Sequence, residues 1–171
     1  TAGVIVRSIT ELDSLYAQGQ RIAFLCPGNY GADFARDTLG LDLERAVKCS
    51  NFIGEAFDHA AYRGYPEILL VGHAGKLVKM AAGVMNTHSS VADARQEIFT
   101  AHAALCGAPR ETLEGLMAAI SVDACVELLD EVNLRQPVLS RIGREMETRI
   151  ALRIKGQARV EFIMFTGKYG V

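Results

Sequence analysis

Short apolar runs alternate with amphipathic stretches along the chain. Four runs predict β-strands, at 21–26 (RIAFLC), 46–51 (AVKCSN), 67–72 (EILLVG) and 158–166 (ARVEFIMFT). A run such as 67–72, apolar on both faces, is typical of a strand buried between helix layers. Strands that alternate with helices indicate a parallel sheet. The pattern therefore predicts an α/β fold, a small parallel four-stranded sheet flanked by helices, with strand order 2-1-3-4.

Capping residues and glycines predict the helices. Ser8 and Glu11 have capping-box spacing, so we expect a short helix over about 9–18 that ends at Gly19, with the apolar opening TAGVIV as a strand or linker. Pro109 fits a helix start and Ser121 a helix cap. Further helices are predicted over 32–40, 52–64, 76–83, 91–106 with Ser90 as cap, and 137–155. We expect a linker and short helix at 1–20 and an α/β domain at 21–171, the C-terminal domain of a longer two-domain protein.

Composition narrows the class of protein. The 171 residues are half apolar and carry a net charge of −2, which suits one packed domain and gives no attraction to nucleic acid. No run is long enough for a membrane span, and no secretory segment opens the chain. We expect a cytoplasmic protein without nucleic-acid or membrane partners; its oligomeric state stays open, with a homo-oligomer as one option. The four cysteines are widely spaced and predict buried free thiols: Cys26, Cys49, Cys106 and Cys125.

The four strands are followed by loops of similar composition. The segments PGNYG (27–31), CSNFIG (49–54), GHAGK (72–76) and TGKYG (166–170) all carry glycine with Asn, Ser, His, Lys or Tyr. Ligands of parallel α/β sheets bind outside the carboxyl ends of the strands. The sequence therefore predicts a ligand site at that edge.

The first two loops leave two interpretations open. The Gly28–Gly31 loop is either a plain strand-to-helix turn or a place where a ligand approaches the backbone. Ser50 and Asn51 are either helix caps or ligand contacts. Gly54 weakens the helix that it enters, so we expect a ligand or a neighbouring helix to lie close to it.

The third loop resembles a phosphate loop only in part. Residues 72–76 lack the full Gly-x4-Gly-Lys-Ser/Thr pattern, which argues against a Walker-type nucleotide site. Lys76 and Lys79 share one helical face near a helix start, where cations oppose the helix dipole. They predict an anionic partner, with solvated surface lysines as the alternative.

Two histidines and an arginine complete the candidates. His73 and His88 lie among small polar residues at helix–loop boundaries, which suits proton transfer or hydrogen bonding to a carboxylate; capping or loop ordering is the alternative. Arg95 could hold a carboxylate, and Asp93 suits a helix start. No histidine or cysteine spacing predicts a bound metal.

In order along the chain, these motifs resemble the C-terminal half of the CbiD family, the cobalt-precorrin-5B C(1)-methyltransferases of the anaerobic cobalamin pathway. The matching stretches are TAGVIV, PGNYG, LGLDLERAVKCSNFIGEAFDHA, the segment 67–104 and KYGV. The resemblance implies an S-adenosylmethionine-dependent C-methyltransferase with a tetrapyrrole acceptor, whose cobalt belongs to the substrate. It also implies a further N-terminal domain with a Gly-Thr-Thr-Gly-Thr-Cys-Ala-type motif, which nothing in this chain matches.

The resemblance suggests roles for the candidate residues. His73 or His88 would be the base. The methyl donor would contact Gly28, Asn29, Tyr30, Gly31, Ser50, Asn51 and Gly54. The acceptor would contact Gly72, Gly75, Lys76, Lys79, Asn86, Thr87, Ser89, Asp93 and Arg95. Two other functions remain: a non-enzymatic nucleotide- or tetrapyrrole-binding module, and a flavodoxin-like phosphate binder unrelated to corrins.

Overall fold

The computed structural model describes residues 2–28, 33, 36–37, 40 and 42–167. The predicted contacts Asn29, Tyr30 and Gly31 lie outside this part of the chain, as does most of the helix predicted over 32–40. The elements follow in the order α1 (Ala2–Ala17), β1 (Ile22–Cys26), η1 (Leu43–Arg45), β2 (Ala46–Lys48), α3 (Ile53–Arg63), β3 (Glu67–His73), α4 (Ala74–Leu77), η2 (Val78–Ala82), α5 (Arg95–Leu105), α6 (Arg110–Ala118), α7 (Val122–Glu131), α8 (Arg135–Ile154) and β4 (Arg159–Phe165).

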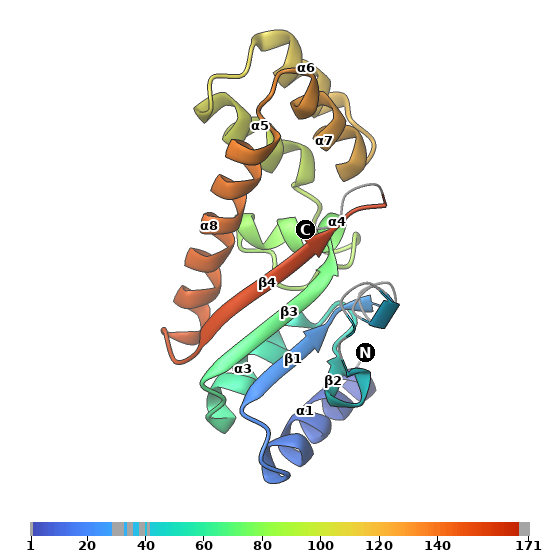
Figure 1. Ribbon diagram of the computed structural model, residues 1–171, viewed down its shortest axis with the longest axis vertical. Coiled ribbons are helices and arrows are strands. Elements are labelled where there is room, and N and C mark those ends of the chain that lie inside the picture. The colour runs from blue at the N-terminus through green and yellow to red at the C-terminus, as the bar shows by residue number, and fades with distance from the viewer. Residues whose placement is uncertain (1, 29–32, 34–35, 38–39, 41, 168–171) are drawn as a thin grey trace.

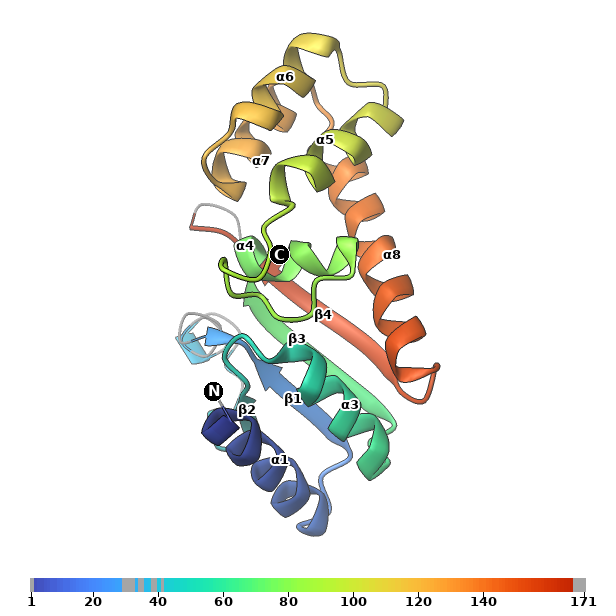
Figure 2. The ribbon, with the colours of Figure 1, turned by 180° about the vertical axis from the view of Figure 1, so that it is seen from behind.

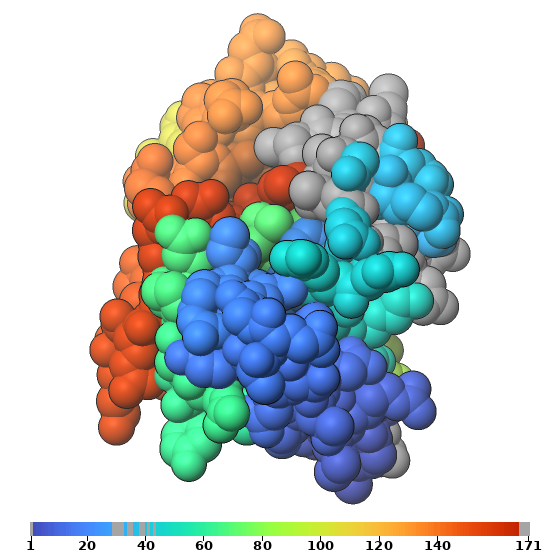
Figure 3. Space-filling model, turned by 60° about the horizontal axis from the view of Figure 1, so that its bottom comes forward, coloured from blue at the N-terminus to red at the C-terminus, as the bar shows by residue number. Residues whose placement is uncertain are grey.

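The sheet has the predicted topology. Its strands are all parallel and lie in the order β2-β1-β3-β4. Strands β3 and β4 pair over their whole length, from Glu67 with Arg159 to His73 with Phe165. Figure 3 shows the end of the molecule where β1, β3 and β4 begin side by side. The carboxyl ends of the strands therefore meet at the opposite edge, where the candidate loops follow.

Alternate strand residues serve two different faces. Helices α1, α3 and α8 cover one face (Figure 2), where Leu25 and Leu70 pack into the main core with Phe57 of α3 and Ile150 of α8. Phe24, Cys26 and Val71 form a smaller buried cluster on the other face, the one that Figure 1 shows in front. This split follows from the two-residue repeat of a strand.

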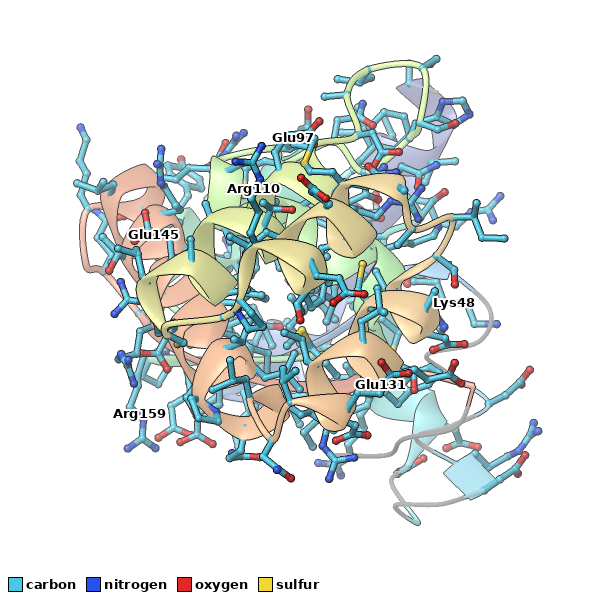
Figure 4. The ribbon with its side chains drawn as sticks, turned by 90° about the horizontal axis from the view of Figure 1, so that it is seen from above. Lys48, Glu97, Arg110, Glu131, Glu145 and Arg159 are labelled. Carbon is cyan, nitrogen blue, oxygen red and sulfur yellow. The ribbon has the colours of Figure 1, made fainter. Side chains whose placement is uncertain are left out.

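Helices α5, α6 and α7 form a cap beyond the carboxyl ends of β3 and β4 (Figure 1). Helix α8 runs from this cap back along the sheet to the start of β4. Figure 4 shows the cap from above, with the exposed residues Arg110 of α6 and Glu131 of α7. The cap thus lies beside the loops that carry the candidate residues. Within the described ranges, every helix is too short or too polar to cross a bilayer.

The prediction for the first twenty residues was wrong in its details. TAGVIV is neither strand nor linker from Ala2 on, because α1 begins there and continues to Ala17. Ser8 is not its cap but a buried residue within it. The Ser8 hydroxyl bonds to the Val4 carbonyl oxygen at 3.0 Å and the Lys48 carbonyl oxygen at 3.3 Å. Ser8 therefore ties α1 to β2, a contact 40 residues away that no local pattern reveals.

Most other helix ends agree with the sequence. Gly64 ends α3 in the left-handed conformation with φ of 102°, and the Ser121 hydroxyl caps α7 by accepting from the Ala124 amide at 3.1 Å. The segment 76–83 is instead one α-helical turn followed by a 3-10 turn. The start predicted for the helix after Ser90 was wrong, because α5 begins at Arg95, after Ala94 in the left-handed region.

Candidate functional site

A cavity of about 480 Å³ lies at the carboxyl edge of the sheet, between the loops and the cap. This volume is within the range of small-molecule sites. Nine predicted candidates line it: Asn51, His73, Gly75, Lys76, Lys79, Thr87, His88, Ser89 and Arg95. Three residues that the sequence did not single out as site residues complete the wall: Ser121, Val122 and Asp123. Residues far apart in the chain thus share one cavity, as the edge rule predicts.

Lys76 is held in place by the loop after β2. Its ammonium donates to Asn51 Oδ1 at 3.1 Å, and the Thr87 hydroxyl donates to the same oxygen at 2.9 Å. Gly28 has φ of 75°, and a Cβ there would lie 3.2 Å from Lys76 Nζ. The glycine therefore permits both the turn and the lysine. Asn51, assigned above to the donor, acts within the protein as the partner of Lys76.

Lys79 is buried, with only 3% of its surface exposed. Its ammonium donates to the carbonyl oxygens of Thr87 at 3.0 Å and Ala92 at 3.1 Å. Burial lowers the pKa of Lys79, and the nearby charges of Arg95 and Lys76 lower it further, against an opposing effect of Asp93. Lys79 therefore fastens the 86–94 loop to η2 with two of its three donors and lines the cavity at the same time. It is not a solvated surface lysine.

Arg95 is paired within the protein. Its Nε and one terminal nitrogen donate to the two oxygens of Asp93, at 2.6 and 3.0 Å, and its backbone amide also bonds to Asp93. The hydrogen bonds from Arg95 hold the pKa of Asp93 at about 2. The guanidinium therefore already binds one carboxylate, and only Nη1 has no partner in the described ranges. Asp93 therefore fixes the Arg95 side chain and also accepts from the first backbone amide of α5.

His73 caps the turn that follows β3. Its Nδ1 accepts a hydrogen bond from the Gly75 amide at 2.9 Å, and its ring packs edge-on against Phe165 with centroids 5.6 Å apart. An amide donor at Nδ1 requires an unprotonated nitrogen there, so a neutral ring carries its proton on Nε2. The capping role that the sequence left open is therefore present in the structure.

His88 is arranged in the same way. Its Nδ1 accepts from the Ser90 amide at 3.1 Å and lies 2.7 Å from the Ser90 hydroxyl. Asn86 supports this turn, since its Oδ1 accepts from the His88 amide at 3.1 Å. Both cavity histidines thus have an occupied Nδ1 and, when neutral, a proton on Nε2.

Some predicted glycines have packing reasons that involve no ligand. A Cβ at Gly54 would lie 2.5 Å from the guanidinium carbon of Arg153, which is paired with Asp58. A neighbouring helix, α8, therefore explains Gly54. A Cβ at Gly72 would lie 3.0 Å from Pro27. Neither glycine lines the cavity.

Ser50 does not line the cavity either. It is not a helix cap, because α3 begins after Phe52 and has no side-chain cap. Ser50 instead adopts a left-handed conformation with φ of 52°, as Ala94 does with φ of 64°. These two residues immediately precede Asn51 and Arg95. Strained backbone of this kind is typical of functional sites, and here it lies next to two cavity residues.

The three buried cysteines do not add a nucleophile. All four cysteines are free, as predicted, but Cys106 is only partly buried, against the prediction. Burial raises the pKa of Cys26 and of Cys49 to about 12, and that of Cys125 to about 11. Since the thiolate is the reactive form, these thiols are inert near neutral pH.

Comparison with known proteins identifies the family. The family model described as "CbiD, C-terminal domain" matches residues 86–171, which include the 86–94 loop, the cap and β4. The chain belongs to the CbiD family. The predicted resemblance is thereby confirmed. No solved structure matched the chain.

Three relatives carry the same description, cobalt-precorrin-5B C(1)-methyltransferase. The one from Ruminiclostridium cellulolyticum is 44% identical over 156 residues, which cover 91% of this chain and 41% of the relative. The one from Clostridioides difficile is 39% identical, covering 91% and 39%. The one from Citrobacter koseri is 38% identical, covering 87% and 38%. The chain therefore spans about two fifths of the length of these CbiD relatives.

Proposed function

We propose that the chain acts as the C-terminal domain of an S-adenosylmethionine-dependent methyltransferase that methylates C-1 of cobalt-precorrin-5B in anaerobic cobalamin synthesis. The observation that carries this proposal is the cavity at the carboxyl edge of the sheet, which Lys76, Lys79 and Arg95 all line. The acceptor carries many carboxylates, which ammonium and guanidinium groups recognise. Relatives with this activity are more than twice as long, so an N-terminal domain would complete the site.

The cavity offers a polar group for the proposed donor. When bound, S-adenosylmethionine supplies the methyl group from its sulfonium centre. The chain offers a buried carboxylate oxygen, Oδ1 of Asp123, which has no partner in the described ranges and can accept from a donor group. The protein's main tasks are to align the two ligands and to exclude water, which require rigid walls. The internal bonds of Lys76 and Lys79 provide such walls.

The two cavity histidines act as hydrogen-bond donors rather than bases. In each neutral ring the basic nitrogen, Nδ1, already accepts from a backbone amide. The Nε2 proton is left to donate to an acceptor carboxylate. Glutamine places an amide near the Nε2 position, so His73→Gln should keep at least a tenth of the turnover of the complete enzyme. A base cannot be replaced in this way, and a loss of about a thousandfold would restore that role.

The experiment that tests the main proposal measures binding and turnover separately. Calorimetry with cobalt-precorrin-5B on this chain should show binding that weakens about tenfold in Lys76→Met. Lys48→Met on β2 is the matched control, because Lys48 is exposed and does not line the cavity. Methyl transfer should appear when the N-terminal domain of the R. cellulolyticum relative is added. Unchanged affinity in Lys76→Met would remove the acceptor role of the cavity.

A non-enzymatic binding module remains the second candidate. It is favoured by the extent of the match, since the chain covers only 41% of the R. cellulolyticum relative. In that case the chain would bind the tetrapyrrole but would not contribute to methyl transfer. Turnover by the relative's N-terminal domain that is equally fast with and without this chain would support the module.

A further inference from the structure

Asp123 is the one cavity residue in the described ranges that has a buried side-chain oxygen without a partner. It is the second residue of α7, and its Oδ1 accepts no hydrogen bond from the part of the chain that the structure describes. A Cβ at Gly167, just after β4, would lie 3.3 Å from Oδ2. The carboxylate is therefore partly buried, and the described residues supply no donor to its Oδ1.

Helix stability does not account for this arrangement. An acid in the first turn interacts favourably with the helix dipole, but this interaction does not require a buried carboxylate oxygen without a donor. The Ser121 hydroxyl already caps α7 by bonding to the Ala124 amide. A buried acceptor without a donor costs free energy. The Oδ1 of Asp123 is therefore placed to accept from a bound molecule.

Charges are separated within the cavity. Lys76 donates to the neutral side chain of Asn51, and Lys79 donates to two backbone carbonyl oxygens, so these bonds leave both ammonium charges uncompensated. They lie on α4 and η2. Asp123 lies on α7 and has no ion pair in the described ranges, whereas Asp93 is neutralised by Arg95. One wall is therefore cationic and the α7 wall anionic.

We propose that Asp123 binds the α-ammonium group of the methyl donor, so that the α7 wall holds the donor and the lysine wall holds the acceptor. This inference rests on the proposed function. The acceptor's carboxylates would be repelled by Asp123, whereas the donor's ammonium group carries three N–H donors and a positive charge. A ribose hydroxyl could satisfy the hydrogen bond but would not compensate the charge. This assignment replaces the donor contacts that the sequence suggested at Ser50 and Gly54, which do not line the cavity.

Two ligands that differ only in the amino-acid part test this assignment. S-Adenosylhomocysteine has the ammonium group, and 5′-methylthioadenosine keeps the ribose and adenine but lacks it. By calorimetry, Asp123→Asn should lower the affinity for S-adenosylhomocysteine at least about tenfold and change the affinity for methylthioadenosine by no more than about twofold. The control Glu131→Gln lies on the same helix, is exposed (Figure 4), and should change neither affinity. Asp123→Glu should retain more of the S-adenosylhomocysteine affinity than Asp123→Asn.

The possible failures are distinguishable. Asp123→Asn could lower the affinities for both ligands equally, by loss of a ribose contact or by misfolding. If Asp123→Glu lowers these affinities as much, the ammonium assignment is overturned. Unchanged S-adenosylhomocysteine affinity in Asp123→Asn also overturns it. Wild-type protein that binds cobalt-precorrin-5B but not S-adenosylhomocysteine overturns the donor site and leaves the acceptor part of the proposed function standing. Wild-type protein that binds neither overturns both.

Discussion

Replacing Lys79 with Met should destabilise the protein more than the same change at Lys76. Lys79 donates to two backbone oxygens, those of Thr87 and Ala92, and hydrogen bonds from charged groups contribute about 1.5–3 kcal/mol each. The change also removes the cost of burying the ammonium and its repulsion by Arg95 and Lys76, which offsets part of the loss. We expect a net decrease of about 2–3 kcal/mol in the free energy of unfolding.

Lys76→Met is the matched comparison. Lys76 has one hydrogen bond, to Asn51 Oδ1, and that oxygen keeps its bond from the Thr87 hydroxyl after the change. We expect a decrease of about 1 kcal/mol or less. Urea unfolding followed by circular dichroism measures both values. Hydrogen exchange should show faster exchange of amides in the 86–94 loop for Lys79→Met only. If the two variants agree within about 0.5 kcal/mol, or the loop stays protected, Lys79 does not hold the loop.

The lowered pKa of Lys79 adds a pH dependence whose sign can be stated. Because its folded pKa lies below the usual 10.5, the folded protein binds fewer protons than the unfolded chain between those two values. Stability from this group therefore rises with pH through that window. The difference in unfolding free energy between wild type and Lys79→Met should grow as the pH approaches 10.5. A difference that shrinks over the same range would contradict the lowered pKa.

Three further predictions concern stability. The pKa of Asp93 is about 2 against a usual 3.8, so the stability that this group contributes is lost as the pH falls through this window. Its side chain is 41% exposed, which reduces the expected effect. In acid unfolding curves, the wild type should lose about 1 kcal/mol more unfolding free energy than Asp93→Asn. Gly54→Ala should destabilise the wild type, because the new methyl group would meet the Arg153 guanidinium, but it should stabilise an Arg153→Ala background by about 0.5–1 kcal/mol. A double-mutant cycle that shows no coupling would exclude the contact between Gly54 and Arg153. Lys155 ends α8 with φ of 55°, so Lys155→Gly should raise the free energy of unfolding by about 0.5–1 kcal/mol, and a lower melting temperature would oppose that reading.

The sheet and its edge could be predicted because their signals are local and periodic. Short apolar runs predicted all four strands, although β2 ends at Lys48 and not at residue 51, and the parallel arrangement followed from their alternation with helices. The edge rule then brought Asn51, which follows β2, together with His73 and Lys76, which lie at the end of β3 and just after it. It could not separate ligand contacts from packing. Gly54 satisfied the same composition rule, yet its neighbour is Arg153 of α8, almost a hundred residues later.

Contacts between distant segments account for what the sequence could not reveal. Ser8 matched a capping box, but its hydroxyl bonds to Lys48, and the buried face of α1 runs through it. Asp123 resembles any first-turn acid, and only the approach of Gly167 and the burial of its Oδ1 distinguish it. At both positions the local sequence is compatible with a simple role at a helix start and with a contact to a distant segment. Only the three-dimensional packing distinguishes these two roles.

The cations of the cavity show why this packing matters for binding. Lys76, Lys79 and Arg95 each have a partner within the protein, and in the described ranges each keeps at least one donor without one. A solvated lysine loses rotamer entropy when it binds an anion, at a cost of about 0.5–1.5 kcal/mol per side chain. Internal partners fix these side chains before a ligand arrives, so the rotamer entropy is lost during folding and not during binding. A carboxylate would therefore meet donors already in position, which distinguishes this wall from a charged surface of the same composition.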